Sequence, residues 1–424
     1  MADESAILLD SRPRPKPKVS TRTELPGPSV PKGTVSVWSV LKSLIGKELS
    51  RSTLPIGLNE PITFLQRLAE YMEHSDLLAQ ATQSDDPQLR IELIAAFAAS
   101  TLSSIRLTKP FNPLLHETYE LNRPELGFNF IAEQVSHHPP ISAFHAQSKT
   151  FEFSGTVAPK VKFWGRSIEC DPGAAFTLKL LRKEGIEIYT WNATSCVIYN
   201  IIMGTMYICA NGHMTIISHS TPYEAKLHFK GAGSGRADLL MEGDVFMHKT
   251  KVSKVYGNWA HFIASMPYKI YMDNAATYEQ NFRKHCDSLV ETCPIVMFKD
   301  SKLLWSSIER PPRSEYFYNF NYFTMMLNEM PENSASLPKT DCRFRPDLKY
   351  FELSEFSKAE YEKNRLEEKQ RAARKRSKKS KKDKEGKWFK YVGKDAFGRD
   401  NQWEFDDTYW TRSVSTVSET DDIF

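Results

Sequence analysis

Two adjacent histidines, His137 and His138, lie in the stretch EQVSHHPPISAF and are followed directly by Pro139 and Pro140. Histidine changes charge near neutral pH, ligates metals and transfers protons. The pair could therefore hold a metal, act as a catalytic base, or form a cationic seat for an anion. A fourth interpretation is structural. Neighbouring residues of a strand face opposite sides, so one ring would belong to the core or the surface, and the prolines would end the strand.

The first two chemistries lack their usual sequence signals. A zinc site takes three or four His, Cys or carboxylate ligands. The chain has neither HExxH nor CxxC, and HETYE at residues 116–120 lacks the second histidine. There is also no GxSxG elbow, P-loop or kinase motif set. We therefore expect no metal, no cofactor, no catalytic residues and no enzymatic activity.

The anion seat is favoured by cations elsewhere in the chain. Upstream, the proline-rich loop LTKPFNPLLHETYEL presents Lys109 and Asn112. Downstream, Lys363, Glu367 and Arg371 follow at i, i+4 and i+8 and so share one face of a charged helix. A multiply charged phosphate group needs several such donors, with a glutamate to orient the cations. The sequence alone leaves open whether loop, strand end and helix converge.

Three helical segments precede the histidines. The first, SVWSVLKSLIGKEL, carries an apolar stripe of Val37, Trp38, Leu41, Leu44, Ile45 and Leu49. The second is TFLQRLAEYMEH, in which Thr63 and Gln66 have the spacing of a capping box. The third, IELIAAFAASTLSSI, is apolar on nearly every side and should be buried.

The texture changes from residue 117 onward. Short β-branched and aromatic runs recur, such as FNFIAEQV, FEFSGTV, IEIYTW and DVFMHK, separated by turn residues. Such a series without intervening helices predicts a meandering antiparallel sheet that curls toward a barrel. A highly charged helix follows in EFSKAEYEKNRLEEKQRAARKRSKKSKKDK. The tail beyond it, with Trp388, Trp403, Tyr409 and Trp410, should dock on the body.

The composition is that of a soluble globular protein, with 41% hydrophobic and 25% charged residues among 424. No apolar run approaches the roughly 18 residues of a membrane span, and the N-terminus lacks a secretory signal. Six cysteines without CxxC spacing indicate reduced thiols and a cytosolic location. Residues 1–35 are rich in Pro, Ser, Arg and Lys and are expected to form a disordered tail, as are residues 413–424.

The sequence resembles the lipid-transfer domain of the oxysterol-binding-protein-related family. EQVSHHPPISAF is similar to the family signature, and LNEPITFLQRLAEYMEH, KPFNPLLHETYEL, PKVKFWGRSIE and RLEEKQRAAR are similar to other landmarks in the family order. The resemblance covers residues 36–412. It implies a short form, without the pleckstrin-homology and ankyrin regions of longer members.

The resemblance implies a β-rich α+β fold. An incomplete antiparallel β-barrel would surround a lipid tunnel, with N-terminal helices, a lid and a C-terminal helical region. The lid would span about residues 37–58, with its underside formed by Trp38, Leu41, Leu44, Ile45, Leu49 and Leu54. The implied function is non-vesicular exchange of lipids between membranes. The cargo would be a phosphoinositide, usually phosphatidylinositol 4-phosphate, and a sterol held in the same tunnel.

The family's headgroup contacts carry over onto seven residues, namely Lys109, Asn112, His137, His138, Lys363, Glu367 and Arg371. Two stretches depart from the family pattern. His116 stands where the loop commonly has glycine, and VYGNWAHFIASMPYKIY is divergent, which bears on sterol specificity.

Several alternatives remain open at this point. The chain could be a lipid-gated sensor or scaffold at membrane contact sites, or phosphatidylserine could be the second cargo. The basic run RKRSKKSKKDK, residues 374–384, could contact anionic membrane, serve as a nuclear signal, or be a solvated helix end. Nucleic-acid binding is not expected, because the run has no interleaved aromatic residues. We expect a cytoplasmic protein in peripheral contact with membranes, and no endoplasmic-reticulum tether is identifiable.

Overall fold

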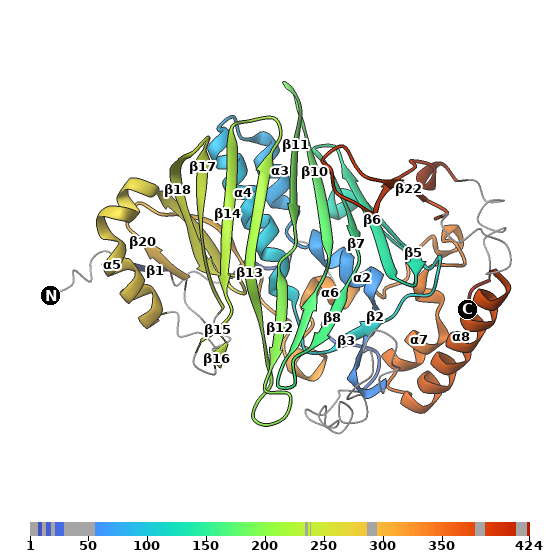
Figure 1. The fold of residues 1–424 in the computed structure, drawn as a ribbon. Coiled ribbons are helices and arrows are strands. Elements are labelled where there is room, and N and C mark those ends of the chain that lie inside the picture. The colour runs from blue at the N-terminus through green and yellow to red at the C-terminus, as the bar shows by residue number, and fades with distance from the viewer. Residues whose placement is uncertain are drawn as a thin grey trace.

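A large antiparallel sheet forms the body of the molecule (Figure 1). The computed structural model describes residues 7–10, 14–17, 22–28, 56–233, 236–237, 239–285, 295–377, 386–412 and 422–424. Along the sheet the neighbours are β21 (Lys302–Ser306), β19 (Phe262–Pro267), β18 (Thr250–Asn258), β17 (Leu240–Met247), β14 (Tyr223–Lys230), β13 (Tyr207–Ser218), β11 (Gly185–Asn192), β10 (Ala174–Arg182), β7 (Phe151–Val157), β6 (Pro140–Ser148), β5 (Phe128–His137) and β4 (Thr118–Arg123). Three further strands branch from β13, namely β12 (Ser195–Tyr199), β9 (Ile168–Asp171) and β8 (Lys160–Phe163).

The sheet curls without closing. Its end strands, β21 and β4, do not pair with each other in the described part of the chain, which confirms the predicted incomplete barrel. Burial alternates along the strands, as expected where one face packs on a core. In β10, Phe176, Leu178 and Leu180 are buried, and the residues between them are partly exposed.

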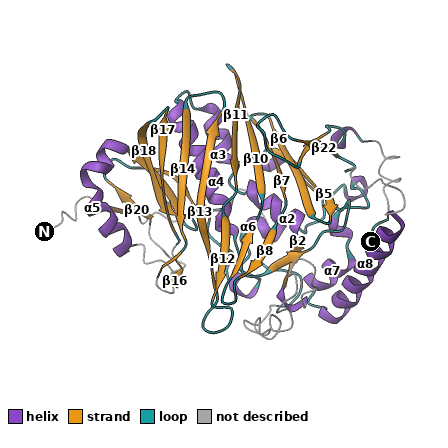
Figure 2. Cartoon of the chain, viewed as in Figure 1, coloured by secondary structure: helices purple, strands orange, loops and turns teal. Residues whose placement is uncertain are grey.

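Helices α2 (Phe64–Ala69), α3 (Asp76–Gln83) and α4 (Pro87–Ser100) pack against the inner face of the sheet (Figure 2). Every residue of α4 from Arg90 to Ser100 is buried, which confirms the expectation of a helix enclosed on all sides. Its ring Phe97 packs edge-on against Phe153 at 5.3 Å between centroids, and Phe153 stacks on Trp191 at 5.5 Å. The apolar core of the barrel is therefore centred on α4.

The predicted start of α2 is partly confirmed. The backbone N–H of Thr63 donates to Gln66 Oε1 at 2.8 Å, which is one half of a capping box. The predicted helix TFLQRLAEYMEH is shorter in the structure, since α2 ends at Ala69. A 3-10 turn follows at Glu70–Met72, and α3 begins at Asp76.

The remaining elements border this body. The strands are β1 (Ile7–Asp10) paired with β20 (Ile295–Phe298), β2 (Asn59–Thr63) paired with β3 (Lys109–Phe111), β15 (Ala232–Gly233) paired with β16 (Arg236–Ala237), and β22 (Phe389–Gly393) paired with β23 (Gln402–Phe405). The helices are α5 (Tyr268–His285), α6 (Tyr322–Met326), α7 (Pro346–Glu352) and α8 (Phe356–Ser377). Short 3-10 turns cover Ile56–Leu58, Thr101–Ser104, Pro124–Leu126, Ser314–Tyr316, Ser334–Ser336, Cys342–Phe344 and Tyr409–Thr411.

The C-terminal aromatic residues dock on the body, as predicted. Trp388, Trp403 and Tyr409 are buried in one apolar cluster with Ile131 and Val135 of β5. The tail therefore packs on the strand that leads to the histidine pair.

The N-terminal expectation differs from what is described. Residues 1–35 were expected to be disordered, yet β1 pairs with β20, and Arg22 Nε donates to the Met325 carbonyl at 2.7 Å. Leu25 is buried beside Ile62 and Phe320. The segment is therefore held by a single buried apolar side chain, Leu25, and by an ion pair between Arg22 and Glu352. The average composition of the segment does not predict these individual contacts.

Three other predicted regions fall largely beyond the described residues. All six lid residues named above lie outside them, as do residues 378–384 of the basic run and 413–421 of the C-terminal tail. The described residues 422–424 contact α8, where Lys369 Nζ pairs with Asp422 at 3.4 Å.

Candidate functional site

The histidine pair occupies the turn of a β-hairpin. His137 ends β5 and pairs in register with Pro140, which begins β6, so His138 and Pro139 form the turn. The two imidazole centroids are 4.6 Å apart, with their planes inclined by 67°. Both rings are therefore held at one end of the sheet by the prolines that follow them.

The proline loop lies against this turn. The ring of His137 forms a hydrogen bond with the backbone of Pro113, which acts to raise the pKa of His137. This contact places the ring against the proline loop. Within the loop, Lys109 Nζ donates to Asn112 Oδ1 at 2.8 Å. His137 Nδ1 is buried and has no hydrogen-bond partner among the described residues. A buried ring nitrogen without a partner is costly unless a ligand or water completes it.

Helix α8 supplies the third side. Lys363 Nζ pairs with Glu367 Oε1 at 3.4 Å, and Gln370 Oε1 accepts from the backbone N–H of Leu115 in the proline loop at 3.3 Å. Both Lys363 and Glu367 lie close enough to Lys109 to act on its pKa. Loop, strand end and helix thus converge, which the sequence had left open. We call Lys109, His137, His138, Lys363 and Glu367 the cationic rim.

The electrostatics of the rim favour an anion. Burial, and then the charge of Lys363, lowers the pKa of Lys109 to about 8. Burial, and then the charges of His138 and Arg374, lowers the pKa of His137 to about 4. At neutral pH the His137 ring is therefore neutral and Lys109 is largely protonated, and an anion placed among these groups would raise both pKa values. The arrangement can therefore bind a multiply charged phosphate with charge-assisted hydrogen bonds.

Arg371 and Asn112 are placed differently from the rest of the predicted set. The side chain of Arg371 is 68% exposed and lies 3.9 Å from Glu367, so it stands at the outer edge of the rim. Asn112 uses its side-chain oxygen to orient Lys109. Five of the seven predicted residues therefore form the cationic rim. Asn112 orients Lys109 within it, and Arg371 lies at its solvent-exposed edge.

The sequence analysis did not identify the buried charged side chains that bind the backbone of the proline loop. Arg345 Nη1 donates to the Asn112 carbonyl at 2.9 Å and to Glu117 Oε2 at 2.8 Å, and its Nη2 donates to Asp347 Oδ2 at 2.7 Å. Glu117 also accepts from the backbone N–H of Leu114 at 2.9 Å. Burial raises the pKa of Glu117 to about 7 in spite of Arg345. The only sequence signal was a charged residue, Glu117, beside a loop of prolines.

Glu133 in the EQVSHHPP stretch was also missed. Its carboxylate is fully buried and accepts from the backbone N–H groups of Lys387 and Trp388 at 2.8 and 2.9 Å. His116 Nδ1 lies 3.3 Å from the same carboxylate. The φ angle of His116 is 64°, a left-handed conformation that favours glycine, which accounts for the glycine expected there from the family resemblance.

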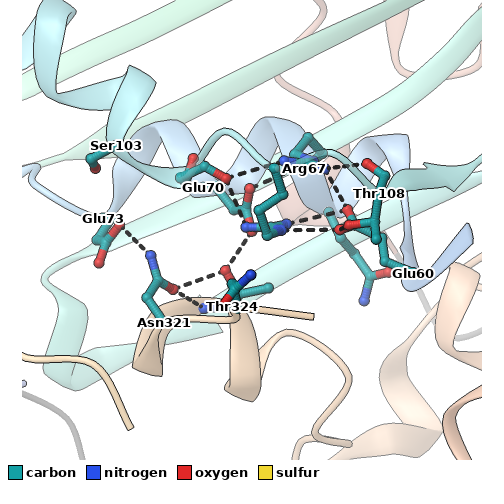
Figure 3. Close-up of polar contacts among 12 residues, drawn as sticks. Glu60, Arg67, Glu70, Glu73, Ser103, Thr108, Asn321 and Thr324 are labelled. Atoms are coloured by element: carbon teal, nitrogen blue, oxygen red, sulfur yellow. Dashed lines mark hydrogen bonds and ion pairs between the residues drawn. The ribbon is translucent and has the colours of Figure 1, made fainter. Parts of the chain in front are cut away.

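A second polar cluster lies beneath the helices and has a structural role (Figure 3). Arg106 binds Glu60 through Nε at 3.0 Å and Glu70 through Nη2 at 2.8 Å, and Arg67 pairs with Glu60 at 2.7 Å. Most polar atoms of the four side chains bind one another or a neighbouring hydroxyl, such as that of Thr108 on Glu60 at 2.6 Å, although Glu70 Oε2 has no hydrogen-bond partner among the described residues. The landmark stretch LNEPITFLQRLAEYMEH therefore reflects a buried ion network that joins β2 to α2.

Other kinds of site find no support in the described part of the chain. No group of three or more His, Cys, Asp or Glu could hold a metal ion there. The cysteines described, Cys170, Cys196, Cys209 and Cys342, are free thiols. None of the described helices has the length and apolar character needed to cross a membrane.

Known protein families and sequences match nearly the whole chain. The family model "Oxysterol-binding protein" matches residues 36–414. The chain is 42% identical over 412 residues to oxysterol-binding protein-related protein 1 of Rattus norvegicus, which covers 92% of this chain and 43% of the rat protein. It is 40% identical over 417 residues to oxysterol-binding protein-related protein 2 of Homo sapiens, which covers 93% of this chain and 86% of the human protein. The chain thus spans less than half of the first relative and most of the second.

Solved structures share the fold. The ORD domain of Osh1 in complex with cholesterol has a TM-score of 0.82 at 31% identity, covering 96% of this chain and 95% of that one. The Osh3 ORD in complex with PI(4)P, from Saccharomyces cerevisiae, has a TM-score of 0.77 at 30% identity, covering 96% of this chain and 99% of that one. These matches confirm the predicted fold and the predicted family resemblance.

Proposed function

The chain belongs to the oxysterol-binding protein family, and we propose that it is a lipid-transfer protein that exchanges a phosphoinositide for a sterol between membranes. The phosphoinositide is phosphatidylinositol 4-phosphate, whose headgroup lies on the cationic rim. The protein acts in the cytoplasm, in peripheral contact with anionic membranes, and is not an enzyme.

The observation that carries the proposal is the convergence of the rim. Lys109, the histidine pair and Lys363 come from three segments, and the pKa values of Lys109 and His137 are both lowered by burial and then by neighbouring cations. An anion placed among these groups would favour their charged forms. The proposal is also supported by a similar protein, the Osh3 ORD, which shares the fold and was solved in complex with PI(4)P. A phosphate monoester carries close to two negative charges and three acceptor oxygens.

The physical need for such a protein lies in the apolar part of the lipid. A lipid that leaves a bilayer exposes several hundred Å² of apolar surface, at a cost of about 25 cal/mol per Å². A tunnel inside the barrel, closed by a lid over residues 37–58, would remove that exposure. The rim would replace the hydration that the headgroup loses with fixed hydrogen-bond donors.

The second cargo is a sterol, supported by the fold shared with Osh1 in its cholesterol complex. A sterol offers one hydroxyl and no phosphate, so it draws little from the rim. If both lipids fill one tunnel, each excludes the other, and linkage makes the competition reciprocal. Loaded protein titrated with the other lipid should release the first, and simultaneous saturation would argue against a common tunnel.

The decisive experiment is vesicle-to-vesicle transfer across a lipid panel that includes phosphatidylserine. Wild-type protein should move many phosphoinositide and sterol molecules per protein, whereas a sensor or scaffold would bind one lipid and move none. The variant His137→Ala with His138→Ala should lose phosphoinositide transfer and keep sterol binding.

A matched control uses another histidine pair. His213 and His228 stack at 4.5 Å between centroids on β13 and β14, away from the rim. Changing both to Ala should leave phosphoinositide transfer unchanged. If both double variants transfer the phosphoinositide at the wild-type rate, the headgroup assignment is wrong. If the His137, His138 variant unfolds at a far lower temperature, the pair is structural.

A further inference from the structure

Two adjacent turns at one end of the sheet expose large apolar side chains. The turn after β8 carries Trp164, and the loop between β12 and β13 carries Met203. Ile168 at the start of β9 pairs with Ile198 near the end of β12, so both turns lie at the same end of these strands. In Figure 1 the loop between β12 and β13 projects at the lower edge of the view.

The exposure at these turns is high. Met203 is 85% exposed, Trp164 64%, Ile202 42% and Val161 41%. We call these four side chains the hairpin tip. Single exposed apolar residues are common on protein surfaces. Three of them, Trp164, Ile202 and Met203, lie on two neighbouring turns, where Gly, Asn and Ser are the usual residues, and Val161 lies on the adjoining strand β8. Turn formation does not explain this group.

The orientation of Trp164 makes its ring available. The indole Nε1–H donates to Glu169 Oε2 at 2.8 Å, and the Trp164 backbone N–H donates to the Ser167 carbonyl at 2.9 Å. With these polar groups satisfied within the hairpin, the exposed ring is apolar. Tryptophan with one apolar side and one satisfied polar group is typical of the boundary between lipid and water.

Exposed cations flank the hairpin tip. Lys160, Lys162 and Arg166 are all exposed on the hairpin formed by β8 and β9. The hairpin also carries two carboxylates, Glu169, which accepts from Trp164, and Asp171, which accepts from the backbone N–H of Gly173. Lysines on an edge strand also prevent pairing with other strands. That role could account for Lys160 and Lys162, but it does not account for Arg166 in the turn or for the apolar side chains beside it.

We propose that the hairpin tip inserts into the surface of an anionic lipid bilayer, with Trp164 and Met203 in the headgroup region and Lys160, Lys162 and Arg166 on its phosphates. This deepens the proposed transfer function, on which it rests, by naming the surface that meets the membrane. The combination of apolar turns with adjacent cations fits a bilayer better than a second copy of this chain, which would bring equal positive charge to the same place.

The first test is binding to vesicles of phosphatidylcholine with phosphatidylserine, measured by co-sedimentation. The variant Trp164→Ser with Met203→Ser should bind at least about tenfold more weakly, because it loses two apolar insertions. A matched control is Ile186→Ser, since Ile186 is 59% exposed at the β10–β11 turn and lies outside the hairpin tip. The control should bind as the wild type does, and all variants should melt at the wild-type temperature.

The second test reads the position of one residue. Brominated lipids in the vesicles should quench tryptophan fluorescence of the wild-type protein, and the quenching should fall sharply in Trp164→Phe. The variant Lys160→Gln, Lys162→Gln, Arg166→Gln should bind more weakly at low salt and show a smaller salt dependence.

The proposal is overturned if the Trp164, Met203 variant binds vesicles as tightly as the wild type, or if Ile186→Ser loses as much. It is also overturned if the wild type is a dimer by sedimentation and the variant a monomer, since the tip would then join two copies. Absence of lipid transfer by the wild type, with vesicle binding still lost in the variant, would refute the proposed cargo and support the docking surface.

Discussion

The carboxylate of Glu133 and the backbone N–H of Trp388 are joined by a hydrogen bond of 2.9 Å across 255 residues of sequence. The same carboxylate accepts from Lys387. Glu133 lies on β5, which ends at His137, and the other two residues follow the segment that leaves α8. One buried charge therefore fixes the return of the chain after α8 to the strand that presents the histidine pair.

Glu133→Gln should destabilise the protein by roughly 1–3 kcal/mol, because an amide oxygen replaces a charged acceptor and one backbone N–H loses its partner. Denaturant unfolding measures the loss, and hydrogen exchange should rise in residues 386–412. The control is Glu152→Gln, which breaks a half-exposed pair with Lys179 and should cost less than about 1 kcal/mol. Equal losses in the two variants would show that Glu133 does not act as a clasp.

Lys109→Met should make the empty protein more stable and abolish headgroup binding. The pKa of Lys109 falls from 10.5 in the unfolded chain to about 8 in the folded one, so folding disfavours its charge. The penalty is fully present below pH 8 and disappears as pH rises to about 10.5. The variant should gain about 1–2 kcal/mol at pH 7, and the gain should shrink in that window.

The same shift makes phosphate binding by the wild type weaken as pH rises through about 8, because the phosphate binds the protonated amine. Lys109→Arg should remove this pH dependence, since arginine stays charged. Calorimetry with inositol phosphate in buffers of different ionisation enthalpy measures the protons taken up. Binding that ignores pH in the wild type would exclude Lys109 from the rim.

Arg345→Met should cost about 3–5 kcal/mol, because it leaves Glu117 and Asp347 buried without their cation. Since Arg345 also donates to the Asn112 carbonyl, headgroup binding should weaken at temperatures where the variant is still folded. Arg365→Met is the control. Its pair with Glu362 is on the exposed face of α8, and the loss should stay below about 1 kcal/mol.

Glu73→Gln should change the pH dependence of stability. Burial, and then the charge of Glu70, raises the pKa of Glu73 from 4.5 to about 8, so the folded state favours the protonated form. That contribution is fully present below pH 4.5 and is lost as pH rises through about 8. The variant, in which the amide oxygen can still accept from Asn321, should exceed the wild type by roughly 2–4 kcal/mol at high pH. Parallel stability curves for the two proteins would contradict the raised pKa.

Local patterns in the sequence predicted much of the fold. The apolar helix α4, the link between Thr63 and Gln66, and the docking of Trp388 and Trp403 all depend on residue types and short spacings, and the structure confirms each. The early end of α2 at Ala69 was not predicted, because the apolar pattern of the sequence continues as far as Met72.

The rim could be predicted only in part. Its cations were identified from their types and spacings, yet their convergence depends on contacts between segments far apart in sequence. The residues that hold the proline loop could not be predicted for the same reason, since Arg345 donates to Glu117, which is 228 residues away in the sequence. A carboxylate that accepts from backbone N–H groups, as Glu133 does, leaves no partner side chain in the sequence to pair it with.

The hydrogen bonds that Glu133 accepts from Lys387 and Trp388 also determine the order in which parts of the rim can form during synthesis. A ribosome adds about 5–20 residues per second, so the 254 residues from Glu133 to Lys387 take roughly 13–50 seconds. The hairpin that carries His137 is therefore made long before α8 and the segment that fastens it. A nascent chain can form most of the sheet during this interval, but it cannot complete the rim. In the proposed function, the headgroup would therefore bind only after the segment that follows α8 has been made and has bound Glu133.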